Sequence, residues 1–201
     1  MKLTEVQIRD AVQQAQKPGG ISQPLKPAQV PLAAAAVLLP LFNNQEKWHL
    51  LFIKRAHHKG DRHSGQIAFP GGRMEPEDVS LLDTALRETR EEIGLNPTMV
   101  QILGELPDLV TVTDYRVTPF IGLIPYPQNL ILSPTEVERT ISIPLNWLSD
   151  QENFVVKKWT PDPNRFSPQE VIFYSRFENE ILWGATARMV HDLLQLLPPF
   201  N

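Results

Sequence analysis

The sequence has 201 residues, 42% hydrophobic and 21% charged, which is typical of a globular domain and excludes a disordered or fibrous chain. The formal net charge of −4 provides no general positive field for a nucleic-acid backbone, so we expect no nucleic-acid polymer as a partner. Cysteine is absent, which excludes disulfides, zinc thiolates and thiol nucleophiles and is consistent with the cytoplasm.

The start of the chain is predicted to be a helix followed by a linker. Apolar residues recur at roughly helical spacing over residues 1–17, and Pro18-Gly19-Gly20 ends the pattern. Residues 21–29 contain two prolines and little periodicity, which favours a surface linker. We therefore expect an N-terminal helix and linker, residues 1–29, and one domain, residues 30–197.

The rest of the chain mixes strands and helices. Residues 30–42 and 49–53 are predicted strands joined around Asn43-Asn44, since asparagine tolerates a positive φ. A helix is predicted over residues 78–93, with Gly94 as its C-terminal cap. Further strands are predicted near residues 100–104, 108–113, 117–124, 139–143, 153–159 and 170–177, with a helical turn at 145–149 and a helix over 186–197. This order indicates a mixed α/β (α+β) domain.

No membrane-spanning segment is predicted. The longest apolar run, residues 30–42, is interrupted by Pro31 and Pro40 and is shorter than the roughly 20 residues that cross a bilayer. The N-terminus also lacks a charged segment followed by an apolar one, so no secretory signal is expected.

Three carboxylates on the predicted central helix are the strongest chemical signal. Glu88, Glu91 and Glu92 stand at positions i, i+3 and i+4, so they share one face of the helix. Like charges at this spacing repel by a few tenths of a kcal/mol per pair, which implies either basic neighbours such as Arg87 and Arg90 or a bound cation. Oxygen ligands alone suit Mg²⁺, Mn²⁺ or Ca²⁺ rather than zinc or copper.

The surroundings of the carboxylates resemble the Nudix hydrolase family. That family's box runs Gly, five residues, Glu, seven residues, then Arg-Glu-apolar-x-Glu-Glu-x-Gly-apolar. Residues 87–95, Arg-Glu-Thr-Arg-Glu-Glu-Ile-Gly-Leu, match its second half apart from Thr89 at the apolar position. The first half differs, because Asp78 follows Gly72 where glutamate is usual and eight residues separate it from Arg87.

The lengthened box resembles the coenzyme A pyrophosphatase branch of this family. In that branch the box follows Phe-Pro-Gly-Gly, here residues 69–72. It also contains an acidic-x-x-Asp step, here Glu75 and Asp78, before Thr-Ala-Leu-Arg-Glu, here residues 84–88. Upstream, Arg55-Ala56 and the segment from His63 to Phe69 look like a further signature, with alanine where serine is common. Downstream, residues 112–119 and 183–187 add to a resemblance that covers roughly residues 30–197.

The resemblance implies a Nudix-type α/β/α sandwich with a mixed β-sheet and a site for Mg²⁺ or Mn²⁺. It makes Glu88 and Glu92 the leading metal ligands, with Glu91 as the third. Arg87 would orient a glutamate through a charge-assisted bond, or form a simple i,i+4 pair with Glu91. The alternative for all of them is a solvated, ion-paired helix face. Glu136 follows a Ser-Pro-Thr turn where Nudix enzymes often place a loop glutamate, as a ligand or as the base, and its alternative is a solvated turn.

The segment from residue 54 to residue 64 is the concentrated basic region of the sequence. Arg55, Lys59 and Arg62 are candidates for binding substrate phosphates, and Gly71 and Gly72 allow the backbone to pass close to metal or phosphate. A solvated basic loop is the alternative for this segment. Its histidines lack the i,i+4 helical spacing of a metalloprotease, so we expect no zinc site.

The expected activity is metal-dependent hydrolysis of a diphosphate bond. By resemblance the substrate is coenzyme A or an acyl derivative, and the products are adenosine 3′,5′-bisphosphate and the 4′-phosphopantetheine moiety. The alternatives are another nucleoside diphosphate derivative, such as ADP-ribose or an oxidised deoxynucleotide, and a non-catalytic nucleotide-binding regulator, although such a regulator is expected to lose box glutamates. The sequence leaves open a monomer or a homodimer.

Overall fold

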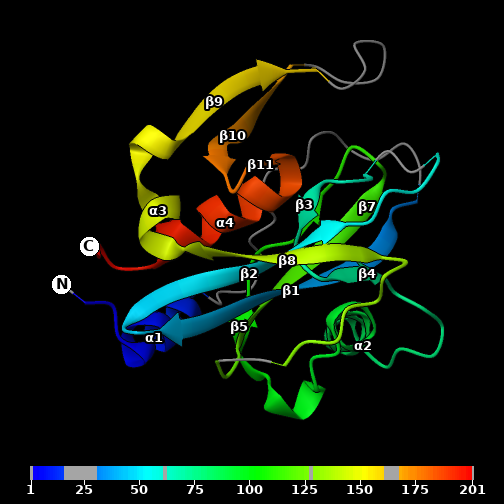
Figure 1. The fold of residues 1–201 in the computed structure, drawn as a ribbon, viewed down its shortest axis with the longest axis horizontal. Helices are drawn as coiled ribbons and strands as arrows, with labels where there is room; N and C mark the ends of the chain where they lie inside the picture. The colour runs from blue at the N-terminus through cyan, green and yellow to red at the C-terminus, as the bar shows by residue number, and fades with distance from the viewer. Residues whose placement is uncertain (1, 16–30, 61–62, 127–128, 161–167, 201) are drawn as a thin grey trace.

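The computed structural model describes residues 2–15, 31–60, 63–126, 129–160 and 168–200 (Figure 1). In chain order the elements are α1 (Glu5–Ala15), β1 (Ala33–Asn44), β2 (Lys47–Arg55), β3 (Ile67–Ala68), β4 (Gly71–Arg73), α2 (Leu81–Ile93), η1 (Pro97–Met99), β5 (Gln101–Glu105), β6 (Leu109–Val110), β7 (Tyr115–Leu123), β8 (Val137–Pro144), α3 (Leu145–Ser149), η2 (Gln151–Asn153), β9 (Phe154–Trp159), β10 (Gln169–Phe177), β11 (Glu180–Trp183) and α4 (Gly184–Leu196). The predicted helix stop at Pro18-Gly19-Gly20 and the linker at 21–29 lie outside these residues. No described helix is both long and apolar enough to cross a membrane.

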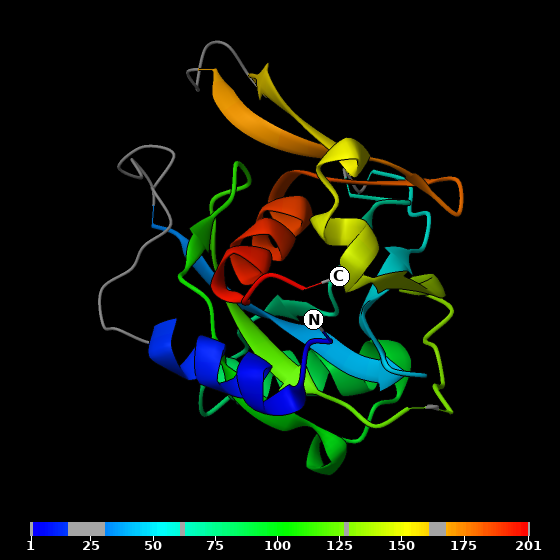
Figure 2. The ribbon, with the colours of Figure 1, turned by 90° about the vertical axis from the view of Figure 1, so that its left-hand side faces the viewer.

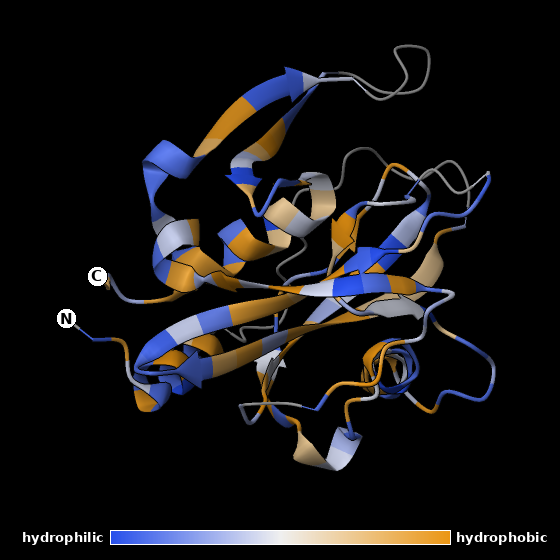
Figure 3. Cartoon of the chain, viewed as in Figure 1, coloured by the Kyte–Doolittle hydropathy of each residue, from blue (hydrophilic) through white to orange (hydrophobic). Residues whose placement is uncertain are grey.

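A mixed β-sheet forms the centre of the molecule. Among the described residues it has eight strands, with the order β3-β2-β1-β7-β5 and with β4, β6 and β8 paired to β1, β7 and β2. The β1–β7 pair is parallel, whereas the other pairs in this sheet are antiparallel. β1 reads as a nearly continuous apolar run because it is covered on both faces (Figure 3).

Helices cover both faces of this sheet, so the predicted α/β/α sandwich is confirmed. On one face α2 packs Ala85 and Ile93 against Ala36 and Leu38 of β1. On the other face α4 and α1 pack against a second apolar core. Figure 1 shows α2 below the sheet and α4 above it.

The N-terminal helix α1 contributes to the core that it shares with α4. Ile8 and Val12 of α1 are completely buried in this core. A hydrogen bond also joins the residues before α1 to the sheet, because the indole Nε1 of Trp48 in β2 donates to the Leu3 carbonyl at 2.7 Å. Figure 2 shows α1 beside α4.

A second, three-stranded sheet has the order β11-β10-β9 and packs against α4. Ion pairs tie its β10–β11 turn to the main sheet, since Glu180 lies 3.0 Å from Lys54 and 3.2 Å from Arg139. We call this sheet the small lobe. Its strands β9 and β10 lie above α4 in Figure 1. The sequence reading predicted β9 and β10 but missed the four-residue β11.

The turn between β1 and β2 corrects one prediction. The residues at positive φ are Gln45 (48°) and Glu46 (66°), not Asn43-Asn44, which instead end β1. The Asn43 Oδ1 accepts from the Glu46 backbone N–H at 3.0 Å, so the asparagine stabilises the turn from the strand that precedes it. A two-residue turn with positive φ matches the twist of the flanking strands.

Candidate active site

The helix that carries the three glutamates is capped at both ends. Ser80 caps the N-terminus of α2 and accepts from the Asp83 backbone N–H at 3.2 Å. The predicted cap Gly94 is confirmed, with φ of 70° and its N–H donating to the Arg90 carbonyl at 2.9 Å. The helix starts at Leu81 rather than at residue 78.

Asp78 lies in the turn that precedes the helix, where its carboxylate accepts hydrogen bonds. It accepts from the Glu75 backbone N–H and from the Thr84 hydroxyl, both at 2.9 Å. It also accepts two hydrogen bonds from Arg87, from Nε at 2.8 Å and from Nη2 at 3.0 Å. The Arg87 guanidinium holds the pKa of this carboxyl well below its usual range, helped by the Glu75 N–H.

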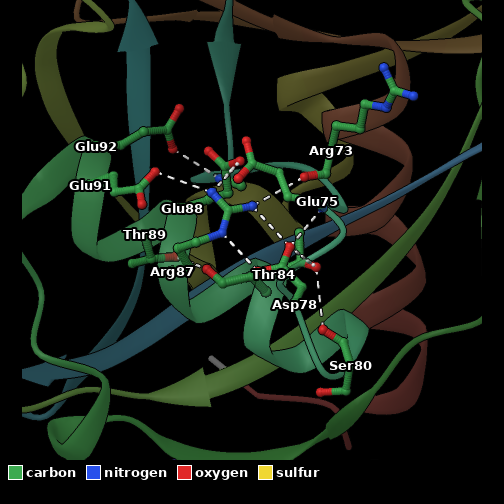
Figure 4. A network of polar contacts seen from close by, with 12 residues as sticks. Arg73, Glu75, Asp78, Ser80, Thr84, Arg87, Glu88, Thr89, Glu91 and Glu92 are labelled. Atoms are coloured by element: carbon green, nitrogen blue, oxygen red, sulfur yellow. Dashed lines mark hydrogen bonds and ion pairs between the residues drawn. The ribbon is translucent and has the colours of Figure 1, made fainter.

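Arg87 makes the largest number of contacts in the polar network of Figure 4. Besides its two bonds to Asp78, its Nη1 donates to Glu88 at 3.0 Å and to Glu91 at 3.2 Å. Its Nη2 also donates to the Arg73 carbonyl at 3.2 Å. The structure therefore contains both arrangements considered for Arg87, the orienting bond to Glu88 and the i,i+4 pair with Glu91. The sequence reading did not assign Asp78 to the site, although its place in the box was a signal.

Glu92 is a buried carboxylate next to the glycine turn. Its side chain is 4% exposed, and its Oε2 accepts from the Gly71 backbone N–H at 2.9 Å. The Arg55 Nη1 lies 4.0 Å from its Oε1. Burial raises the pKa of Glu92 to about 8, although the Gly71 N–H and the Arg55 charge act in the opposite direction.

Glu88 lies against the other glycine of the turn. A Cβ on Gly72 would stand 2.4 Å from the Glu88 Cδ, so only glycine fits there without displacing the carboxylate. Gly71 has φ of 148°, and a Cβ on it would lie 2.3 Å from the Ala36 carbonyl oxygen. Burial raises the pKa of Glu88, opposed by the charge and hydrogen bond of Arg87.

The two remaining acidic candidates are more exposed. The Glu91 side chain is 47% exposed and bonds Arg87. Glu136 is exposed, and its carbonyl accepts from the Ala56 N–H at 2.8 Å, which joins its loop to the basic segment. After burial and other neighbours, the negative charge of Glu136 also contributes to raising the pKa of both Glu88 and Glu92, so it acts on both carboxylates.

The carboxylates fit a hard divalent cation by their chemistry. Among the described residues no three acidic or histidine side chains already converge as a ligand group. However, Glu92 and Glu88 are carboxylates whose ionised forms are disfavoured by burial, and a cation bound beside them would offset that cost. All the available donors are oxygens, which Mg²⁺ and Mn²⁺ prefer.

The basic segment meets the box at one wall of a cavity. This cavity has a volume of about 460 Å³, and its lining includes Arg55, His63, Gly71 and Gly72. Lys59 is exposed and is not part of the lining. The third cationic candidate, Arg62, lies outside the described residues.

Comparisons with known proteins identify the family of the chain. The NUDIX domain family model matches residues 31–172. The uncharacterized Nudix hydrolase NudL of Yersinia pestis (strain Pestoides F) is 36% identical over 162 residues, which cover 80% of this chain and 78% of the relative. NudL of Yersinia pseudotuberculosis serotype O:1b (strain IP 31758) gives the same values.

Solved structures are more distant in sequence. An Ap4A hydrolase binary complex from C. elegans has a TM-score of 0.49 and 19% identity, covering 56% of this chain and 80% of that chain. The Nudix hydrolase RenU from M. smegmatis has a TM-score of 0.49 and 16% identity, covering 59% of this chain and 74% of that chain. The extent of the family match and the 36% identity to NudL decide the assignment: the chain belongs to the Nudix hydrolase family.

Proposed function

We propose that the protein hydrolyses the diphosphate bond of coenzyme A or an acyl derivative, in the presence of Mg²⁺ or Mn²⁺. The products are adenosine 3′,5′-bisphosphate and 4′-phosphopantetheine, or its acylated form. One observation carries the choice of substrate: Arg55, from the upstream signature of the coenzyme A branch, lies 4.0 Å from Glu92 of the box and lines the same cavity as Gly71 and Gly72. A cationic group beside the box is suited to an additional phosphate of the substrate.

In this proposal Glu88, Glu91 and Glu92 hold the cation. A bound Mg²⁺ or Mn²⁺ polarises phosphoryl oxygens and lowers the pKa of water. Arg87 keeps the Glu88 and Glu91 carboxylates in place through its bonds to both and to Asp78. Gly71 and Gly72 let the backbone approach the diphosphate, and the Gly71 N–H orients Glu92.

We assign the proton transfer to Glu136. Its side chain is exposed, and its negative charge contributes to raising the pKa of Glu88 and of Glu92. A group in this place can accept the proton of the attacking water. Arg55 and Lys59, together with Arg62, are the proposed phosphate-binding cations, with arginine suited to bidentate contacts.

Initial rates on a substrate panel test this function. With Mg²⁺ or Mn²⁺ we expect coenzyme A to be hydrolysed, and we expect excess chelator to abolish the reaction. Loss of a charged hydrogen bond to the 3′-phosphate predicts that kcat/KM for 3′-dephospho-coenzyme A is lower by about ten- to a hundredfold. Faster hydrolysis of ADP-ribose or an oxidised deoxynucleotide than of coenzyme A would contradict the proposed substrate.

Two charge-removal variants locate the phosphate contact. We expect Arg55→Gln or Lys59→Gln to reduce the preference for coenzyme A over its 3′-dephospho form. Lys2→Gln is the matched control, because Lys2 is exposed and pairs with Glu46 on the β1–β2 turn. Equal rates of the unmodified protein on the two substrates would rule out the phosphate contact but not the diphosphatase activity.

A further inference from the structure

The cavity beside the box extends away from the carboxylates as an apolar chamber between the main sheet and the small lobe. We call it the chamber. One wall comes from the main sheet, with Val37, Ile67 and Val110, and the opposite wall comes from the small lobe, with Ile172 and Trp183. Its volume of about 460 Å³ lies in the range of pockets that enclose a small organic ligand.

The chamber is continuous with the catalytic carboxylates through the glycine turn. Gly71 and Gly72 line it, and the same two residues contact Glu92 and Glu88. A diphosphate bound at the carboxylates would therefore direct one of its two substituents into the chamber. The question is which substituent the walls suit.

The walls favour an apolar chain over the nucleotide end. The cationic residues Arg55 and Arg73 line the chamber beside the glycine turn, next to the proposed phosphate site, and Arg188 is paired with Asp192. The rest of the lining is mostly aliphatic and aromatic, and burying a polar base there without partners would be costly. Gln169 also lines the chamber, and its buried Nε2 has no hydrogen-bond partner among the described residues. An amide donor of this kind can bind a carbonyl oxygen at the start of an acyl chain, which leaves the chain itself to the apolar walls.

The small-lobe wall is held in position. Trp183 stacks on Phe173 of the neighbouring strand with ring centroids 5.5 Å apart. Glu180, at the start of β11, is fixed to the main sheet by Lys54 and Arg139. The chamber is thus present before substrate binds, and a preformed pocket loses little free energy to ordering on binding.

We propose that the chamber binds the acyl chain of an acyl-coenzyme A, so that the protein selects substrates by chain length. This inference rests on the proposed function. A fully buried methylene increases affinity about fourfold, so burial of only two already gives more than tenfold. Affinity should rise with chain length until the chamber is filled.

Binding without turnover is the first test. Calorimetric titration of the unmodified protein in excess chelator, with coenzyme A, acetyl-, butyryl- and octanoyl-coenzyme A, should give a Kd at least about tenfold lower for octanoyl- than for acetyl-coenzyme A. With metal added, kcat/KM should follow the same order. Equal Kd values along the series would overturn the inference.

A pair of tryptophan variants locates the effect. Val171→Trp introduces a large side chain at a half-buried chamber residue of β10 and should reduce the octanoyl-to-acetyl ratio of kcat/KM at least about fivefold. Val155→Trp is the control, because Val155 on the adjacent strand β9 is 49% exposed and does not line the chamber. If Val171→Trp fails to fold, Ala185→Leu reduces the same space from α4.

The outcomes separate the inference from the proposed function. Hydrolysis of coenzyme A with no dependence on chain length would contradict only the acyl chamber. Weaker binding of adenosine 3′,5′-bisphosphate to Val171→Trp, with the acyl preference unchanged, would assign the chamber to the nucleotide end and also overturn the inference. If coenzyme A and all its acyl forms resist hydrolysis while ADP-ribose is cleaved, the proposed function itself is wrong.

Discussion

At the level of single residues, the site combines carboxylates that resist ionisation with one that is held ionised. Burial raises the pKa of Glu92 and Glu88, whereas the Arg87 guanidinium lowers that of Asp78. These opposite shifts match different roles. Asp78 and Arg87 form an ion pair, and Glu92 and Glu88 are the carboxylates that we propose to bind a cation.

Removing the charge of Glu92 or of Glu88 should abolish most of the activity. Glu92→Gln keeps an oxygen that can accept from the Gly71 N–H, so the local fold should persist. We expect Glu92→Gln and Glu88→Gln each to lower kcat at least about 10²-fold, as for other losses of charge stabilisation. Steady-state kinetics with Mg²⁺ measures this, with Glu152→Gln in η2 as the control. A near-normal kcat in either variant would remove that residue from the metal site.

The Asp78–Arg87 pair should make stability depend on pH in one direction. The pKa of Asp78 in the folded protein lies below its ordinary value of 3.8, so its ionised form favours folding above that pH. This contribution disappears as the pH falls through the folded-state pKa. Arg87, the Glu75 N–H and the Thr84 hydroxyl face this carboxylate and produce the shift.

Melting temperatures of the wild type and Asp78→Asn measure this effect. The wild type should melt at the higher temperature above about pH 5, and the gap should narrow below about pH 4. Asp10→Asn, exposed on α1, controls for the loss of one negative charge. A gap that stays the same down to about pH 2 would show that the Asp78 charge does not stabilise the fold.

At the level of elements, the helices and strands that have a periodic sequence pattern could be predicted, whereas the tertiary contacts between them could not. The helix of the box and its Gly94 cap could be predicted because carboxylate spacing and a glycine after an apolar residue are local signals. The bond between Arg87 and Asp78 spans nine positions and a turn, and the missed strand β11 is held by pairing with β10. The convergence of Arg55 with Glu92 likewise depends on how β2 lies beside the box.

The glycine turn before α2 should tolerate no side chain at Gly72. Gly72→Ala would place Cβ 2.4 Å from the Glu88 Cδ and displace that carboxylate. We expect kcat to fall about 10²-fold, since a displacement of about 1 Å can have that effect. Gly122→Ala is the matched control, with a Cβ 2.6 Å from Val100 but on β7, in a different environment. Both variants should have a lower melting temperature than the wild type, but only Gly72→Ala should lose activity. An unchanged kcat in Gly72→Ala would contradict the close contact between Gly72 and Glu88.

At the level of the whole molecule, the two faces of the sheet pack against different helices. The face covered by α2 carries the box, and the face covered by α1 and α4 holds the larger core. The apolar patterns of the sequence predicted individual helices and strands, whereas the two helical layers were expected from the resemblance to the family. The sequence did not indicate that α1 would pack beside α4, because the residues that bring them together are far apart in the chain.

The packing of α1 predicts that the N-terminal helix contributes to the stability of the domain. Ile8→Ala should lower the free energy of unfolding by about 2–5 kcal/mol, because Ile8 is completely buried. Val6→Ala, at a residue that is 64% exposed, should change it by less than about 0.5 kcal/mol. Urea denaturation measures both. Equal free energies of unfolding for Ile8→Ala and the wild type would show that the packing of α1 does not stabilise the domain.

The central claim is that the protein cleaves the diphosphate bond of coenzyme A, and the products of one reaction test it most directly. Coenzyme A is incubated with the protein and Mg²⁺ in ¹⁸O-labelled water, and the products are analysed by mass spectrometry. We predict adenosine 3′,5′-bisphosphate and 4′-phosphopantetheine, one of them carrying a single ¹⁸O in its newly formed phosphate. Intact coenzyme A, or release of the 3′-phosphate with the diphosphate unbroken, would contradict the claim.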